Sequence, residues 1–145
     1  PLEEADPSAP HGLDCAYEVF RFLCSLVEPT SVNPENTAAV HVLGLSLTKA
    51  ALEAGGSAYG RHAPLLALVG ENLCLSLAQL SWAPSLEVLS LVLQNAALLC
   101  TELADPLRHQ YEQLLLRVHL RLVGHRAPSA EVVELAMESL LDLCE

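Results

Sequence analysis

Apolar residues recur every three or four positions through most of the chain, a spacing that is typical of amphipathic α-helices. This pattern predicts helices over residues 13–28, 35–53, 64–80, 85–102, 106–123 and 129–145. No run of β-branched residues alternates with polar ones, so strands are not expected. The chain is therefore expected to be all-α, with about six helices.

Turn-forming residues mark the expected ends of these helices. Asp14 is the expected cap of the first helix, and Pro29 ends it. Asn33 is the expected cap of the second helix, which ends at the Gly55-Gly56 pair. Ser129 begins a sequence that resembles a capping box and is expected to start the last helix.

Two apolar stripes are expected to point into the core. In the first helix the stripe is Cys15, Val19, Phe22, Leu23 and Leu26. In the second helix it is Val40, Leu43, Leu47, Ala50 and Ala51, widened by Leu45 and Leu52. Residues 85–102 are apolar almost all round, so this helix is expected in the middle of a stack.

Helices of about 15–20 residues joined by short loops favour antiparallel pairs stacked one after another, as in armadillo and HEAT solenoids. A compact helical bundle is the alternative, since no internal sequence repeat is evident. Residues 1–12 are acidic and contain three prolines, so they are expected to form a flexible arm before a helical domain at residues 13–145.

The composition narrows the possible function classes. Hydrophobic residues make up 52% of the chain and charged residues only 17%, which suggests that a partner covers part of the apolar surface. The net charge of −11 excludes nucleic acid as a partner and argues against anionic membrane binding by this segment alone. The five cysteines form no C-x-x-C pair, so neither a zinc site nor a disulfide framework is expected, and a reducing cytosol fits best.

No segment carries a recognisable active site. Residues 55–62 share only glycine spacing with a phosphate-binding loop, because Arg61 and His62 replace its lysine and hydroxyl residue and no strand precedes them. The histidines of residues 109–125 do not share a helical turn, as a metal-binding pair would, and His41 is expected to be a hydrogen-bonded core residue. We therefore expect no catalytic residue, no cofactor and no metal ligand.

Charged residues near the C-terminus form two clusters. Acidic side chains recur along the last helix at Glu131, Glu134, Glu138, Asp142 and Glu145. The preceding segment carries four of the seven basic residues, namely Arg108, Arg117, Arg121 and Arg126. The simple explanation is a pair of solvated helices joined by surface salt bridges. The alternative is docking of an acidic partner or a lipid head group, with Arg117, Arg121, Glu134 and Glu138 as the candidate protein-docking residues.

Several segments, in this order, resemble the large Golgi-type ARF guanine nucleotide exchange factors, the family of GNOM and the brefeldin A-resistance factors. These segments are PHG at residues 10–12, FLCSL at 22–26, ALEAGG at 51–56, RHAPLLAL at 61–68, ENLC at 71–74, and the stretches 108–122 and 133–140. The matching region is the HUS domain, which lies upstream of the catalytic exchange domain and is α-helical and armadillo-like in this family.

The resemblance implies a non-catalytic regulatory or scaffold domain for Golgi vesicle trafficking. Its implied partners are the family's N-terminal dimerisation and cyclophilin-binding domain and an ARF or Rab GTPase, with peripheral Golgi membrane association of the full-length protein. The catalytic glutamate and the Asn-Tyr-Asp-Cys HUS box are expected downstream of residue 145. An unrelated HEAT- or armadillo-type adaptor in membrane traffic is the alternative that explains the composition equally well.

Overall fold

The computed structural model describes residues 12–124 and 129–144, and the described residues contain no strand. Six helical rods follow one another along the chain: α1 (Leu13–Val27), α2 (Ala38–Gly55), the α3–α4 rod (Ala63–Leu80), α5 (Leu86–Glu102), the α6–α7 rod (Arg108–Val123) and α8 (Ala130–Asp142). The all-α prediction is confirmed. The predicted arm lies outside the described residues except for Gly12, as do His125 and Arg126.

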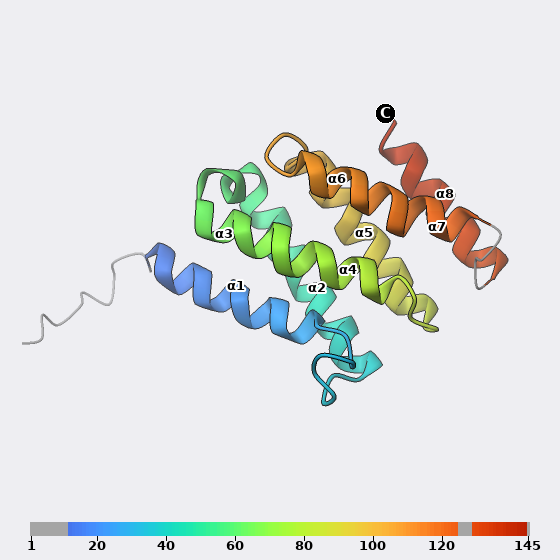
Figure 1. Ribbon diagram of the computed structural model, residues 1–145, viewed down its shortest axis with the longest axis horizontal. Coiled ribbons are helices and arrows are strands. Elements are labelled where there is room, and N and C mark those ends of the chain that lie inside the picture. Colours follow the sequence, from blue (N-terminus) through green and yellow to red (C-terminus); the bar gives the residue numbers. More distant parts are fainter. Residues whose placement is uncertain (1–11, 125–128, 145) are drawn as a thin grey trace, which may run out of the picture.

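The rods form three antiparallel pairs in two layers (Figure 1). The pairs are α1 with α2, the α3–α4 rod with α5, and the α6–α7 rod with α8. One layer holds α1 and the two composite rods, and the other holds α2, α5 and α8. Helix α5 packs against both α2 and α8, which places it in the middle of the stack as predicted. This sequential stacking of pairs agrees with the predicted solenoid-like arrangement.

Both composite rods contain one wide helical turn. In the first rod, α3 (Ala63–Ala67) and α4 (Cys74–Leu80) are separated by a π-helical turn, η2 (Leu68–Leu73). In the second, α6 (Arg108–Leu114) and α7 (Leu120–Val123) are separated by the π-helical turn η3 (Leu115–His119). A short 3₁₀ helix, η1 (Gly56–Arg61), connects α2 to α3.

Two helix starts differ from the prediction. Helix α2 begins at Ala38 rather than residue 35, because the hydroxyl of Thr37 caps it by accepting the N–H of Val40 at 3.5 Å. Helix α6 begins at Arg108, two residues later than the predicted first residue Pro106, because residues 104–107 form turns. Asp14 is not a cap either, since Gly12 occupies that position in α1.

Two predicted helix ends are confirmed. The hydroxyl of Ser129 accepts the N–H of Val132 at 3.3 Å and caps α8. Gly56 follows α2 with a φ angle of +47°, which residues with a side chain rarely adopt. The glycine pair therefore ends α2 for a conformational reason.

The predicted core-facing stripes of α1 and α2 are only partly correct. Leu45 and Leu52 are buried, and Leu23 and Ala51 pack against the core, as predicted. In α1 the buried side chains are Phe20, Cys24 and Val27, whereas Cys15, Val19 and Phe22 are exposed. In α2 the buried residues are His41, Gly44, Leu45, Thr48 and Leu52, whereas Leu43, Leu47 and Ala50 are exposed. Both helices carry apolar residues on more than one face, so periodicity alone did not identify the face that the neighbouring helices cover.

Side-chain hydrogen bonds hold the pairs in register. The amide of Asn36 donates to the carbonyls of Ser25 and Glu28 at 2.9 and 2.8 Å, and Nε2 of His41 donates to the same Glu28 carbonyl at 2.9 Å. These bonds satisfy carbonyls at the C-terminal end of α1. His41 is thus the hydrogen-bonded core histidine that the sequence predicts. Between α2 and α5, the buried amide of Asn95 donates to the Leu45 carbonyl at 3.1 Å.

The Ala63–Leu80 rod is long and apolar enough to cross a membrane, judged by length and composition alone. Its apolar content has another explanation, because Leu65, Leu68, Leu73 and Leu77 are buried in the core between the helices. Core helices of folded domains often reach such hydropathy, so this feature is weak evidence for a span.

Candidate functional site

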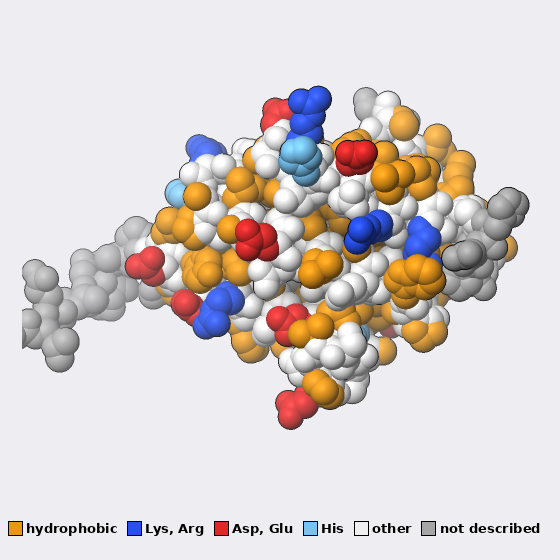
Figure 2. Space-filling view, in the orientation of Figure 1, with side chains coloured by type: hydrophobic (Ala, Val, Ile, Leu, Met, Phe, Trp, Pro, Cys, Tyr) orange, Lys and Arg blue, Asp and Glu red, His pale blue; other side chains and the backbone are white. Residues whose placement is uncertain are grey.

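Arg117 and Arg121 lie one turn apart on the surface where the α6–α7 rod meets α4. Arg117 is exposed and lines a hollow of about 140 Å³ between the two rods, together with Cys74, Ala78 and Gln113. Figure 2 shows basic side chains beside hydrophobic ones over this region of α4 and α7. The structure therefore brings the two predicted basic residues to one surface, which we call the basic surface and define by Arg117, Arg121 and Trp82.

Arg121 stacks on Trp82, a contact that the sequence did not predict. The guanidinium carbon of Arg121 lies 3.9 Å from the centroid of the Trp82 ring, a cation–π geometry, and Trp82 is 65% exposed. Burial lowers the pKa of Arg121. Its Nε and Nη2 atoms are shielded from solvent and have no hydrogen-bond partner among the described residues.

The acidic residues of α8 face a different surface. Glu138 lines a hollow bounded by α2, α5 and α8, whereas Glu134 is exposed and lies outside that hollow. The ion pairs between described residues are Arg21 with Glu18 and Lys49 with Glu53. The predicted salt bridges between the basic residues and the α8 acids are therefore absent from the described part of the chain, because Arg117 and Arg121 point toward α4.

A third surface follows from the exposed apolar side chains of the α1–α2 pair. Val19, Phe22, Leu43 and Leu47 are all exposed, Phe22 by 62% and Leu43 by 54%. We call this group the end face, since α1 and α2 form the N-terminal end of the stack (Figure 1). The sequence pattern assigns these four residues to the core because they are apolar. The structure shows that they lie on the surface instead.

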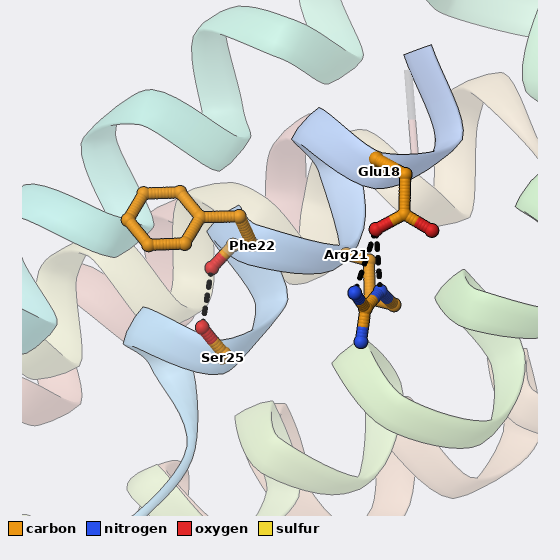
Figure 3. Close-up of polar contacts among 4 residues, drawn as sticks. All are labelled: Glu18, Arg21, Phe22 and Ser25. Carbon is orange, nitrogen blue, oxygen red and sulfur yellow. Dashed lines mark hydrogen bonds and ion pairs between the residues drawn. The ribbon is translucent and has the colours of Figure 1, made fainter. Parts of the chain in front are cut away.

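The two helices that carry the end face approach each other closely. A Cβ atom on Gly44 would lie 2.8 Å from Cβ of Leu26, so the backbones nearly touch there. Phe22 is one turn from Leu26 on α1, and Leu43 and Leu47 are one and three residues from Gly44 on α2, so both helices carry exposed apolar residues close to this contact. Figure 3 shows the Phe22 ring directed toward α2, away from the exposed ion pair of Arg21 and Glu18.

The buried titratable groups carry no sign of nucleophilic chemistry. Burial raises the pKa of the Cys24 and Cys74 thiols to about 12 and that of Cys100 to about 11, so all three stay protonated. The fully buried His119 is hydrogen-bonded through Nε2 to the Ser139 hydroxyl at 3.0 Å, and burial lowers its pKa. This hydrogen bond joins η3 to α8. These groups act as packing residues.

No group of three or more metal-binding side chains comes together in residues 12–124 and 129–144. His62 and His109 are exposed, and His41 and His119 are buried and hydrogen-bonded. The described residues thus contain no cluster of side chains suited to holding a metal ion.

The amino-acid sequence of this chain is similar to that of a known protein family. A family model described as the HUS domain of Mon2/Sec7/BIG1-like proteins matches residues 12–145. The chain is 35% identical to the ARF guanine-nucleotide exchange factor GNOM of Arabidopsis thaliana, over 93% of this chain and 10% of GNOM. It is 33% identical to the exchange factor GNL1 of the same plant, over 94% of this chain and 10% of GNL1.

An animal relative is the Golgi-specific brefeldin A-resistance guanine nucleotide exchange factor 1 homolog of Caenorhabditis elegans, which is 30% identical over 92% of this chain and 7% of its own length. No solved structure matches the chain. The chain thus spans about a tenth of the curated relatives it matches. Since the family model covers nearly all of it, this chain belongs to the HUS-domain family of Mon2/Sec7/BIG1-like proteins.

Proposed function

We propose that this chain is a regulatory HUS domain of an ARF guanine nucleotide exchange factor and that it works by docking helical protein segments. The HUS domain is the non-catalytic part of these exchange factors, so the chain is not the exchange domain. The relatives are named as ARF exchange factors, and the chain covers only about a tenth of their length. Family membership decides against the unrelated helical adaptor.

The end face is the observation that carries this proposal. A helical stack needs a polar outer surface wherever it ends in water. Here the terminal pair exposes Phe22, Val19, Leu43 and Leu47 instead. Burying an exposed side chain of this size contributes about 1.5–3 kcal/mol, so a partner that covers all four has a substantial driving force.

The proposed occupant of the end face is a helical pair from the N-terminal dimerisation and cyclophilin-binding domain. Such a pair would extend the stack in the same way that α3–α4 and α5 extend it on the other side of α1 and α2. Apolar side chains on both surfaces would then form one continuous core across the junction. This contact is the intramolecular part of the proposed scaffold role.

The test is association of this chain with that N-terminal domain, measured by size-exclusion chromatography with light scattering. A stable complex is expected, and Phe22→Glu or Leu43→Glu should abolish it. The matched control is Leu141→Glu, because Leu141 is also 61% exposed but lies in α8 at the other end of the chain. Undiminished binding by both end-face variants, or no complex with the unmodified chain, would refute the proposal.

A second proposed docking site is the basic surface, for an acidic segment of an ARF or Rab GTPase. The exposed guanidinium of Arg117 and the neighbouring positive charge of Arg121 favour a carboxylate-bearing partner. The double variant Arg117→Glu/Arg121→Glu should weaken GTPase binding, whereas Arg108→Glu on the same rod should not. Anionic vesicles serve as a second probe, because vesicle binding without GTPase binding would assign the surface to lipid head groups instead.

In the full-length protein this domain is proposed to act in the cytoplasm at the periphery of Golgi membranes. The support is the name of the animal relative, which is described as Golgi-specific. Fluorescence imaging of the tagged full-length protein tests this location. Co-localisation with a Golgi marker is expected, and a diffuse signal throughout the cytoplasm would contradict it.

A further inference from the structure

A groove runs along α5 on the surface of the α2–α5–α8 layer. Two neighbouring hollows of about 470 and 610 Å³ lie on this surface, and both are lined by Ser90, Gln94 and Leu135. Because they share these residues, the hollows form one continuous groove with α2 as one wall and α8 as the other. We call it the acidic groove and define it by these two hollows.

The length of the acidic groove matches that of a helix. Its lining begins at Leu86 near the start of α5 and reaches Thr101 near the end. At a rise of 1.5 Å per residue, this stretch of α5 is about 22 Å long, which equals about four helical turns. A segment of about 15 residues in helical conformation would therefore fit along it.

The floor combines small and apolar side chains. Ser90 and Ala97 are half-buried, which allows a close approach of a helix backbone. Leu91 and Leu98 of α5 and Leu135 of α8 are also half-buried and offer apolar contact area. Such a floor suits the apolar stripe of an amphipathic helix.

The rim of the groove is strongly acidic. Its acidic lining residues are Glu53, Glu87, Glu138 and Asp142, and its one basic lining residue is Lys49. Lys49 is already paired with Glu53 at 3.1 Å. Glu87, Glu138 and Asp142 have no ion pair with any described residue. Three acidic side chains are thus left to attract positive charge.

We infer that the acidic groove binds a basic amphipathic helix of a partner protein, about 15 residues long, with lysine or arginine on both flanks of an apolar stripe. The apolar stripe packs on α5, and the basic side chains pair with Glu138 and Asp142 on one wall and with Glu87 near one end. The acidic rim repels anionic lipid and nucleic acid, which leaves protein as the partner class. This inference does not depend on the end face or the basic surface.

The experiment uses a 14-residue helical peptide of leucine and lysine as the probe, with a leucine and glutamate peptide of the same pattern as the negative control. Binding to the whole chain is measured by fluorescence anisotropy. The double variant Glu138→Lys/Asp142→Lys should weaken binding about tenfold. Glu71→Lys/Glu112→Lys is the matched control, because both residues are exposed on the other layer and the change in net charge is the same. It should weaken binding less than about twofold.

A second variant tests the shape of the groove without changing its charge. Ala97→Trp fills the floor without changing a charge and should also weaken binding about tenfold, while circular dichroism reports an intact fold. Equal weakening by the two charge-reversal variants would mean nonspecific attraction to an acidic chain and would overturn the inference. Full binding by Ala97→Trp, or no saturable binding up to about 1 mM, would overturn it as well.

Discussion

Gly44 of α2 and Leu26 of α1 stand so close that a Cβ atom on the glycine would lie 2.8 Å from Cβ of the leucine. The backbone carbonyl carbon of Leu26 would be 3.1 Å from the same Cβ, so the clash could not be relieved by a side-chain rotation alone. This contact sets the spacing of the terminal helix pair. It thereby sets the shape of the end face.

We predict that Gly44→Ala destabilises the chain by about 1–3 kcal/mol, although alanine is the better helix former. The steric cost of parting α1 and α2 exceeds the gain in helix propensity. Thermal or urea unfolding measures the difference. Gly70→Ala is the control, because its Cβ would meet the flexible ends of Gln110 and Leu107 at 3.2 and 3.3 Å, and it should destabilise the chain less.

The contact between His119 and Ser139 predicts acid sensitivity. Burial lowers the folded-state pKa of His119 below 6.5, so the unfolded chain takes up the proton first as the pH falls. The stabilisation by neutral His119 is therefore present above about pH 6.5 and is lost as the pH falls through the lowered value.

Unfolding measured between pH 7 and pH 5 should show a smaller pH dependence for His119→Gln than for the unmodified chain. His109→Gln serves as the control, since His109 is exposed on α6. An unchanged pH dependence in His119→Gln would contradict this assignment. At neutral pH, Ser139→Ala should cost about 1 kcal/mol through loss of the hydrogen bond.

The cysteines should divide into two reactivity classes. Cys15 and Cys144 are exposed, whereas Cys24, Cys74 and Cys100 are buried and protonated because their pKa values are raised to about 11–12. Mass spectrometry after alkylation of the native chain should find two modified thiols, and denatured chain should show all five.

The raised thiol pKa values also predict alkaline lability. The unfolded chain loses thiol protons near pH 9, before the folded chain does. The stability that these thiols contribute is thus fully present below about pH 9 and is lost as the pH rises toward 12. Replacing Cys74 by alanine removes one such group and should flatten the decline above pH 9. An unaltered decline would argue that the thiol ionises freely in the folded chain.

A nucleotide-exchange assay with this chain and an ARF GTPase should show no acceleration of nucleotide release. The reason is that the chain is a HUS domain, which is the non-catalytic part of these exchange factors. The same assay with the longer protein is the positive control. Faster release with this chain alone would contradict the non-catalytic assignment.

Sequence periodicity predicted the six rods because each one is a long run of helix-forming, largely apolar residues bounded by glycine, proline or a capping residue. It predicted that Leu45 and Leu52 face the core, but it did not choose correctly among the other apolar residues of α1 and α2. That choice depends on the Gly44–Leu26 contact and on α5 packing beside Leu45, and both are tertiary relationships. The one-turn spacing of Arg117 and Arg121 was also visible in the sequence, whereas the stacking on Trp82 was not.

The acidic stripe of α8 was also predicted from the sequence, whereas the surface that it helps to form was not. Its spacing placed Glu134 and Glu138 on neighbouring turns, but only the packing of α8 against α5 brings Glu138 to the groove. Glu53 and Glu87 join it from two other helices, more than 30 residues apart in the chain. A pattern within one helix cannot reveal such a surface.

The central claim is that a helical domain covers the end face, and the native thiol of Cys15 tests it most directly. Cys15 is exposed on α1, and Val19 and Phe22 follow it at four- and three-residue steps on the same side of the helix. Cys144 is exposed in the C-terminal part of the chain and provides an internal control. The measurement is the alkylation rate of each thiol, with and without the N-terminal domain at saturating concentration. Covering of the end face predicts that Cys15 reacts at least about tenfold more slowly in the complex while Cys144 is unaffected. An unchanged Cys15 rate in a complex that has demonstrably formed would contradict the claim.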